Sequence, residues 1–370
     1  MTRVRSIELR LVAIPLVRPF RTSFGEMRTK ECILARVETD EGHGWGECVA
    51  GATPDFSEEW NEGVWRVIED FLAPALLDVG ETSPADIEGL LDHVRGHPMA
   101  KATLMNAFLD ATLRAEGRSL ASFLGADRDR VACGVSVGIA PTTGALIEQV
   151  DAYLEEGYGR IKLKIEPGTD VERVRAVRAA HPDVLLSVDA NAAYTLADTG
   201  LLARLDAFDL LMLEQPLHHD DLLDHAKLQG RIRTAVCLDE SIRSAARAAA
   251  AIELGACRIV NVKQGRVGGV LEARRVHDVC AAQDVPVWCG GMLETGIGRA
   301  TNLALAAMPN FTLPGDTSAS RRYFAEDLTD PFELAPDGTM GVPPGPGIGV
   351  DPRPERLEAC TLRFLRLEKE

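Results

Sequence analysis

The stretch RIKLKIEPG, residues 160–168, carries the pattern that decides the fold. Ile161 and Leu163 alternate with Lys162 and Lys164, and Glu-Pro-Gly ends the run. Alternation with a period of two residues predicts a β-strand whose two lysines share one face. On a surface strand that face would lie in water. Where it lies here depends on how the neighbouring segments are arranged.

This strand belongs to a regular series between residues 132 and 316. Eight short apolar runs alternate there with helical stretches, and they read ACGVSVG, RIKLKI, VLLSVDAN, DLLMLEQP, AVCLDES, RIVNVK, VPVWCGG and FTLPGD. Apolar strands separated by helices are typical of a parallel sheet covered on both faces. Eight of them favour a (β/α)8, TIM-like barrel over an open doubly wound sheet, whose GxGxxG motif is absent. The predicted fold class is therefore α/β.

Segments on either side of the barrel predict a second, smaller α+β unit. Residues 3–50 alternate like antiparallel strands, three helical patterns follow, and ACTLRFLRL near the end of the chain reads as one more strand. That last strand could rejoin the N-terminal region, so that both ends of the chain form one capping domain. The predicted units are residues 1–125 for the capping domain, 126–324 for the barrel and 325–370 for the segment that rejoins the cap.

Two stretches of the predicted cap show no periodicity. PLVRPFRTSFGEMRTK (15–30) and CVAGATPDFSEE (48–59) contain Pro and Gly and read as long loops. Long loops in compact domains often serve as lids or binding loops. We therefore expect both stretches to cover a binding site.

Composition and charge exclude several classes of partner. The chain has 40 basic and 56 acidic residues, a net charge of −16, and no Lys/Arg-rich run, which argues against binding to nucleic acid or to an anionic membrane. The eight cysteines form no CxxC pair, so we expect buried, reduced thiols. Arg10 and Pro15 interrupt any signal-peptide core, and no apolar run approaches the ~20 residues of a membrane span. These features predict a soluble, cytoplasmic protein.

Five polar residues recur in phase with the predicted strands. Lys164, Asp189, Glu214, Asp239 and Lys263 each follow the previous one by 24 or 25 residues, which is the length of one βα unit. Each of them taken alone could be a helix cap or a solvated side chain. Together they fall at the carboxyl ends of strands two to six, which converge at the mouth of a barrel where active sites lie. The common phase favours a functional site.

The residue types at this mouth indicate a chemistry. Three converging carboxylates cannot all ionise unpaired, and oxygen ligands select a hard divalent cation, Mg²⁺ or the related Mn²⁺. Open coordination positions would accept a small-molecule carboxylate substrate. Lys164 and Lys263 lie on opposite sides of the predicted barrel. Two bases on opposite faces of a bound carboxylate suit the removal and return of an α-proton.

Longer motifs around these residues resemble a known family. KLKIEPG, SVDANAAYT, LLMLEQPL, VCLDES, IVNVKQGRVGG and WCGGMLETGIGRA together resemble the enolase superfamily, within its muconate-lactonizing-type subgroup the o-succinylbenzoate synthase / N-acylamino acid (N-succinylamino acid) racemase family. The resemblance extends over essentially the whole chain. It implies Mg²⁺ ligands at Asp189, Glu214 and Asp239, with Lys164 and Lys263 as the acid/base pair.

The resemblance also implies supporting residues. Lys162 would tune Lys164 electrostatically, Asn191 would orient the metal site, and the two early loops would act as a lid. The residues that the family places in its substrate pocket correspond here to Phe24, Ser136, Met292 and Glu294.

Some positions depart from relatives of other specificity or from the family pattern. The seventh strand run lacks the histidine of mandelate-racemase-like members, and Asp316 is followed at position 318 by serine instead of the second aspartate of dipeptide epimerases. Gln264 stands where the family pattern has proline, and residues 50–54 read AGATP, with small side chains in place of a bulky lid residue.

The resemblance leaves the function open among three hypotheses. The leading hypothesis is an N-succinylamino acid racemase that works by 1,1-proton transfer through an enediolate and can also carry out the syn dehydration to o-succinylbenzoate. One alternative is a dedicated o-succinylbenzoate synthase of menaquinone biosynthesis. The other is a non-catalytic, metal-binding barrel. By analogy with barrels of this kind we expect a homo-oligomer.

Overall fold

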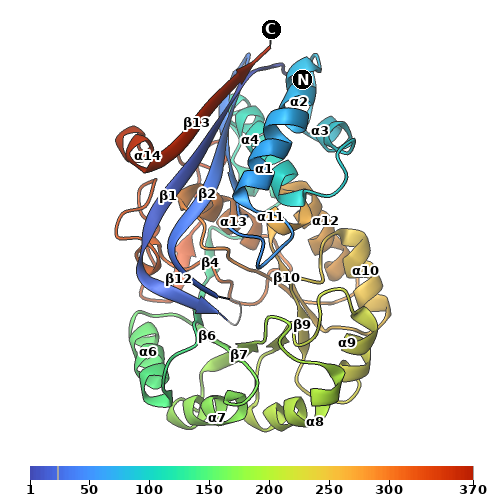
Figure 1. The fold of residues 1–370 in the computed structure, drawn as a ribbon, viewed down its shortest axis with the longest axis vertical. Coiled ribbons are helices and arrows are strands. Elements are labelled where there is room, and N and C mark those ends of the chain that lie inside the picture. Colours follow the sequence, from blue (N-terminus) through green and yellow to red (C-terminus); the bar gives the residue numbers. More distant parts are fainter. Residues whose placement is uncertain (23–24, 370) are drawn as a thin grey trace.

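The protein is described by a computed structural model that covers residues 1–22 and 25–369. Figure 1 shows two layers, with an antiparallel sheet and its helices above a ring of strands and helices. The upper sheet has the order β13-β1-β2-β3. Its strands are β1 (Val4–Thr22), β2 (Gly25–Thr39), β3 (Gly42–Cys48) and β13 (Thr361–Glu368). The C-terminal strand pairs with β1, so both ends of the chain form the cap, as predicted.

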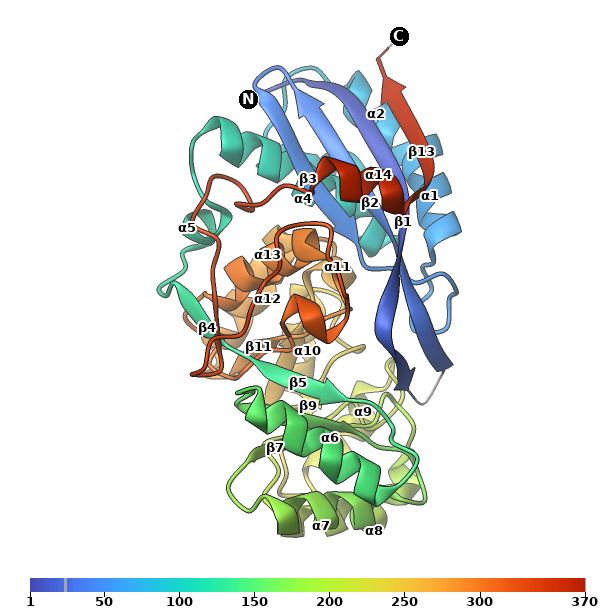
Figure 2. The ribbon, with the colours of Figure 1, turned by 90° about the vertical axis from the view of Figure 1, so that its left-hand side faces the viewer.

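Helices cover one face of the cap sheet. They are α1 (Asn61–Val67), the π-helical turn η1 (Ile68–Leu72), α2 (Ala73–Asp78), α3 (Pro84–Leu91) and α4 (Pro98–Ala115), and the short α5 (Leu120–Leu124) that follows leads to the barrel (Figure 2). The long helix α4 packs directly on β3. A Cβ atom at Gly44 or at Gly46 would lie 2.1 Å from a backbone atom of α4, so only glycine permits this approach.

The lower layer is the predicted barrel. Its parallel strands are β5 (Gly134–Val137), β6 (Arg160–Lys164), β7 (Leu185–Asp189), β8 (Leu213–Glu214), β9 (Val236–Leu238), β10 (Ile259–Val262) and β11 (Val287–Cys289). The outer helices are α6 (Thr143–Glu155), α7 (Asp170–Ala180), α8 (Thr199–Leu202), α9 (Leu222–Gln229), α10 (Ala245–Glu253), α12 (Val270–Ala281) and α13 (Gly296–Ala306), and the buried turn α11 (Gln264–Val267) lies against α4 of the cap. Apolar side chains between the strands and these helices form most of the core.

The eighth predicted strand is not a continuous strand. Phe311 forms an isolated parallel bridge with Val287 of β11, and Gly315 forms one with Cys133, next to β5. Pro314 lies between these bridges and has no N–H to donate to a ladder. The segment nevertheless closes the ring between the first and seventh strands, so the barrel prediction holds.

The tail returns to the cap by way of the barrel. The short strand β12 (Thr339–Gly341) pairs with β4 (Arg130–Ala132), and helix α14 (Pro354–Cys360) then leads into β13. Asp110 of α4 fastens the tail, because its carboxylate accepts hydrogen bonds from the backbone N–H of Trp45 at 2.8 Å and of Ile348 at 2.7 Å.

The loop predicted over residues 15–30 is wrong for the part that the structure describes. β1 runs to Thr22 and β2 begins at Gly25, so the stretch is the end of a long hairpin, which Figure 2 shows extending from the cap beside the barrel. The alternation was hidden because the register shifts between Pro15 and Phe20. In this bulge the Val17 N–H donates to Tyr323 O at 2.9 Å, so the hairpin is docked on the barrel segment.

The second predicted loop, residues 48–59, is irregular as expected. Gly51 and Trp60 form a bridge across its base. Glu59 fixes the segment to the start of α4, because its carboxylate accepts from Met99 N at 2.7 Å and Ala100 N at 3.0 Å. Glu59 therefore caps this helix with a buried carboxylate.

The cysteine prediction is confirmed, because all eight thiols are buried and free. Across residues 1–22 and 25–369, no helix combines the length and apolar character needed to cross a bilayer.

Glu59 predicts a dependence of stability on pH. Burial raises its pKa to about 7, against the opposing effect of the two backbone N–H groups. Because the folded state favours the protonated form, this group's contribution to stability is complete below its unfolded pKa near 4.5 and is lost as the pH rises to about 7. We expect Glu59→Gln to reduce the difference in unfolding free energy between pH 5 and pH 8 by up to about 3 kcal/mol.

Urea unfolding at the two pH values measures this difference. Glu62→Gln, a matched change at an exposed position of α1, serves as the control and should leave the difference as in wild type. An unchanged pH dependence in Glu59→Gln would show that Glu59 does not titrate in this range.

Candidate active site

The parallel register of the barrel brings the predicted strand-end residues together. Lys164 is paired in register with Asp189, and Asp189 with Glu214, at the ends of β6, β7 and β8. Asp239 and Lys263 directly follow β9 and β10. All five side chains are buried or nearly so, and they point into the barrel mouth under the cap. The lysine face of the strand at 160–164 is thus turned away from solvent.

Lys164 is held between two side chains from the end of β7. Its Nζ donates to Asp189 Oδ2 and to Asn191 Oδ1, both at 2.6 Å. Asn191 also donates its backbone N–H to Asp189 Oδ1 at 3.0 Å and has a φ of 42°, in the left-handed region that asparagine tolerates. The amide of Asn191 donates to Glu240 Oε1 at 3.1 Å. Local backbone geometry therefore orients Asn191 toward the lysine.

Lys162 faces the same interior one layer deeper. Its Nζ lies 2.8 Å from both Glu214 Oε2 and Asp316 Oδ2, and 3.3 Å from Asp189 Oδ2. Asp316 is also held by Arg160 at 2.8 Å. Although burial lowers the pKa of Lys162, these three carboxylates raise it well above its ordinary value. Lys162 is a fixed positive charge in the barrel.

Lys263 lies across the mouth from Lys164. Its Nζ contacts Asp239 Oδ2 at 2.7 Å, and the other oxygen of that carboxylate accepts from Arg266 Nη1. A Cβ at Gly290 would lie 2.7 Å from Lys263 Cε, so this glycine leaves room for the lysine. The two lysines therefore approach the site from β6 and β10, each paired with a different carboxylate.

Charge neutralisation determines the protonation of the carboxylates. Burial alone would raise the pKa of Asp189, but Lys164 and Lys162 lower it well below its ordinary range. Burial and the nearby Asp189 raise the pKa of Glu214. Burial also lowers the pKa of Arg266 to about 9. The interior thus holds closely spaced opposite charges, as expected of a site built for ionic chemistry.

A cavity of about 300 Å³ lies over Lys164, Asp189 and Lys263, whereas Glu214 and Asp239 are not in its wall. Barrel residues in its wall include Ser136, Lys162, Lys164, Asp189, Asn191, Lys263 and Met292, and the cap contributes the β1–β2 hairpin and residues 49–57. Of the predicted pocket residues, Ser136 and Met292 therefore line the cavity. Glu294 does not, because its carboxylate turns back to accept from Met292 N at 2.8 Å. Phe24 lies outside the described residues.

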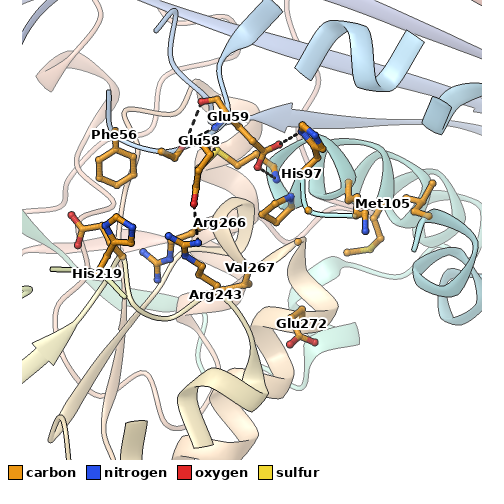
Figure 3. Close-up of a pocket in the computed structure, with 18 of the residues that line it drawn as sticks. Phe56, Glu58, Glu59, His97, Met105, His219, Arg243, Arg266, Val267 and Glu272 are labelled. Carbon is orange, nitrogen blue, oxygen red and sulfur yellow. Dashed lines mark hydrogen bonds and ion pairs between the residues drawn. The ribbon is translucent and has the colours of Figure 1, made fainter. Parts of the chain in front are cut away.

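A second cavity of about 1060 Å³ lies on the other side of the 54–59 segment, which forms part of both walls. Figure 3 shows Glu58 of this segment reaching Arg243 of the barrel, with a separation of 2.8 Å. The larger cavity contains neither Lys164 nor Lys263 in its wall. The smaller cavity is therefore the candidate active site.

Three contributors to the site were not assigned a role from the sequence. Arg266 binds Asp239, Glu240 binds Asn191, and Asp316 bridges Arg160 and Lys162. Arg266 lies in a glycine-rich run that reads as a turn, although its position three residues after Lys263 places it one helical turn further on. Asp316 is the last residue of the eighth strand run, FTLPGD.

Two family profiles match the chain. Residues 6–125 match the mandelate racemase / muconate lactonizing enzyme N-terminal domain, and residues 145–356 match the enolase C-terminal domain-like family. An N-succinylamino acid racemase from Amycolatopsis sp. is 58% identical over 97% of this chain and 98% of its own length. An o-succinylbenzoate synthase from Geobacillus kaustophilus is 47% identical over 98% of this chain and 97% of its own length.

The fold agrees with these matches. The crystal structure of an enolase-superfamily member from Listeria innocua superposes with a TM-score of 0.96 at 40% identity, and the match covers 100% of both chains. The sequence matches and this superposition span both the cap and the barrel. The chain therefore belongs to the enolase superfamily of enzymes.

Proposed function

We propose that the chain is an N-succinylamino acid racemase that depends on a divalent cation and works by 1,1-proton transfer, with the capacity for syn dehydration to o-succinylbenzoate. The observation that carries the proposal is the placement of Lys164 and Lys263. They enter the mouth from β6 and β10 and flank the carboxylates of the strands between them. A planar intermediate held between them can receive a proton on either face.

The donor set of the site fits a hard divalent cation. Asp189, Glu214 and Asp239 supply carboxylate oxygens from neighbouring strand ends, without thiolate or imidazole among them. Members of this superfamily depend on a divalent metal ion, and we propose Mg²⁺, or Mn²⁺ in its place, held by these three residues. When bound, the cation would supply positive charge that stabilises the negative charge developing on the substrate carboxylate.

The configuration of the substrate then decides which of the two lysines acts as the base and which as the acid. For one enantiomer Lys164, as the neutral amine, takes the α-proton, and Lys263, as the ammonium, donates a proton to the opposite face. For the other enantiomer the direction is reversed. Hydrogen bonds to Asn191 and to the two carboxylates aim the amines before the reaction, which reduces the cost of orientation.

Lys162 has a different task. Its three carboxylate contacts keep it charged and fixed, so it contributes positive potential beneath the reacting groups. We propose that it tunes Lys164 electrostatically and takes no proton itself.

Dehydration to o-succinylbenzoate is the second reaction that this site supports. It begins with the same proton removal, and the enediolate then expels a β-leaving group in place of being reprotonated at the α-carbon. Lys164 can serve as base and then as acid on one face, as a syn elimination requires. A dedicated synthase remains the alternative, and the 47% identity to a protein of that name supports keeping it in the test.

Single lysine variants test the assignment of the two bases. With N-succinylamino acids in D₂O, we expect Lys164→Ala to abolish racemisation while exchange of the α-hydrogen continues for the enantiomer that faces Lys263. Lys263→Ala should show the opposite enantiomer preference. Loss of a general acid–base group predicts a decrease of roughly 10²–10⁴-fold or more in the affected direction.

Proton NMR of each pure enantiomer measures exchange, and polarimetry measures racemisation. Near-full turnover by Lys164→Ala would refute its role. Supplying the cyclohexadiene precursor of o-succinylbenzoate to the same variants separates the two reactions, because a dedicated synthase would process only that compound.

Removal of divalent ions tests the metal proposal. Exhaustive chelation should reduce both activities to background, because the three carboxylates would then have only protein cations to balance them. Added Mg²⁺ or Mn²⁺ should restore activity, whereas Asp239→Asn should require a much higher ion concentration. Circular dichroism before and after chelation controls for unfolding. Full activity in the chelated, folded enzyme would contradict the proposal.

A further inference from the structure

One buried cation in the wall of the active-site cavity has no part in the proton transfer described above. Lys30 lies on β2 of the cap, is 2% exposed and lines the 300 Å³ cavity together with the barrel lysines. It is among the largest fully buried side chains of the described residues. A charged side chain in such a position calls for a partner.

Every other cation that lines this cavity is ion-paired. Arg28 contacts Glu26 at 2.7 Å, and the three barrel lysines pair with the strand-end carboxylates. Among the described residues, by contrast, Lys30 has no carboxylate oxygen within 4.0 Å. Within the described part of the chain, its ammonium donates a hydrogen bond to the backbone oxygen of Met292, at 3.1 Å.

Glu47, a candidate counter-ion, already binds other groups. Burial raises the pKa of Glu47, and the positive charge of Lys30 opposes this effect, so the two groups sense each other. However, both oxygens of Glu47 are taken by the backbone and hydroxyl of Thr295 and by Gly298 N, at 2.6–3.0 Å. An ammonium has three N–H groups, so Lys30 retains capacity for an anion in the cavity.

The position of Lys30 defines which part of a substrate it can meet. The reacting carboxylate belongs at the barrel mouth, with Lys164 and Lys263, whereas Lys30 belongs to the cap wall next to Met292. A ligand that reaches both walls must carry a second anionic group distant from its α-carbon. The compounds named for the two relatives described above both carry such a group. N-succinylamino acids and o-succinylbenzoate each bear a succinyl chain that ends in a carboxylate.

We propose that Lys30 binds the distal carboxylate of the acyl chain and thereby selects dicarboxylic acyl groups over neutral ones. This inference rests on the proposed racemase and synthase function. The ammonium of Lys30 exchanges its incomplete set of contacts for an ion pair with the substrate. Lys30 is a binding residue, and it takes no proton from the reacting carbon.

Two substrates of matched length test the proposal. N-succinylmethionine and N-butanoylmethionine differ only in the terminal group of the acyl chain, which is carboxylate in the first and methyl in the second. The wild-type enzyme should prefer the succinyl compound, chiefly through a lower KM. Lys30→Met should reduce the ratio of kcat/KM values for the two substrates by about tenfold to hundredfold, as expected for the loss of a charged hydrogen bond. Lys30→Arg should retain most of the ratio.

The outcomes separate this inference from the function beneath it. If wild type racemises neither compound, the proposed function fails. If wild type racemises both with equal kcat/KM, or if Lys30→Met lowers both values by the same factor, the assignment of Lys30 is wrong while the function stands. The wild-type comparison remains decisive even if Lys30→Met does not fold. Lys227→Met, which removes an exposed lysine of α9, controls for the loss of one positive charge and should leave the ratio unchanged.

Discussion

Charge balance inside the barrel is the constraint on which the rest of the site depends. A carboxylate taken out of water is tolerated only when cations or N–H groups surround it. Here acidic and basic side chains alternate across the interior, and four of its carboxylates have at least one cation as a partner. The pairs are Asp189 with Lys164, Glu214 with Lys162, Asp239 with Lys263 and Arg266, and Asp316 with Arg160 and Lys162.

This ionic layer rests on an apolar floor. Met212, Cys237, Ile259 and Trp288 form a separate small cluster, and the ring of Trp288 lies 4.8 Å below the ammonium of Lys162. A packed floor prevents water from reaching the charges from beneath and fixes their positions. The amines of Lys164 and Lys263 are therefore held above a packed interior, whereas access from above is left to the cap.

The cap acts as the second wall of the site because direct hydrogen bonds hold it to the barrel. Lys30 reaches Met292 O, Glu47 reaches Thr295, and Asn106 of α4 donates to Gln264 Oε1 at 2.6 Å. Gln264 stands where the family pattern has proline, and a proline there could not accept this bond. The departure noticed in the sequence thus corresponds to a contact between the two units.

The sequence predicted the barrel and its mouth because both follow from periodicity. The spacing of 24 or 25 residues between Lys164, Asp189, Glu214, Asp239 and Lys263 reflects repeated βα units, and parallel register then aligns the strand ends. Contacts between distant segments leave no such period. The bulge in β1 concealed the hairpin.

The partners of Arg266 and Lys30, and the turn of Glu294 toward Met292 N, likewise depend on tertiary packing alone. A lysine in a cap strand with alternating side chains looks like any half-exposed position. Only the structure shows that it lies in the wall of the active-site cavity.

The cap wall and the barrel wall of the cavity would contribute differently to racemisation and dehydration. Both begin with removal of a proton next to a carboxylate, and both relatives' compounds carry a succinyl chain. An ion pair between that chain and Lys30 would stabilise ground state and transition state alike, and would do so equally for either reaction. It can therefore select the substrate class but cannot choose the reaction. That choice must rest with the groups around Lys164 and Lys263, which decide whether the enediolate is protonated at carbon or loses its β-substituent first.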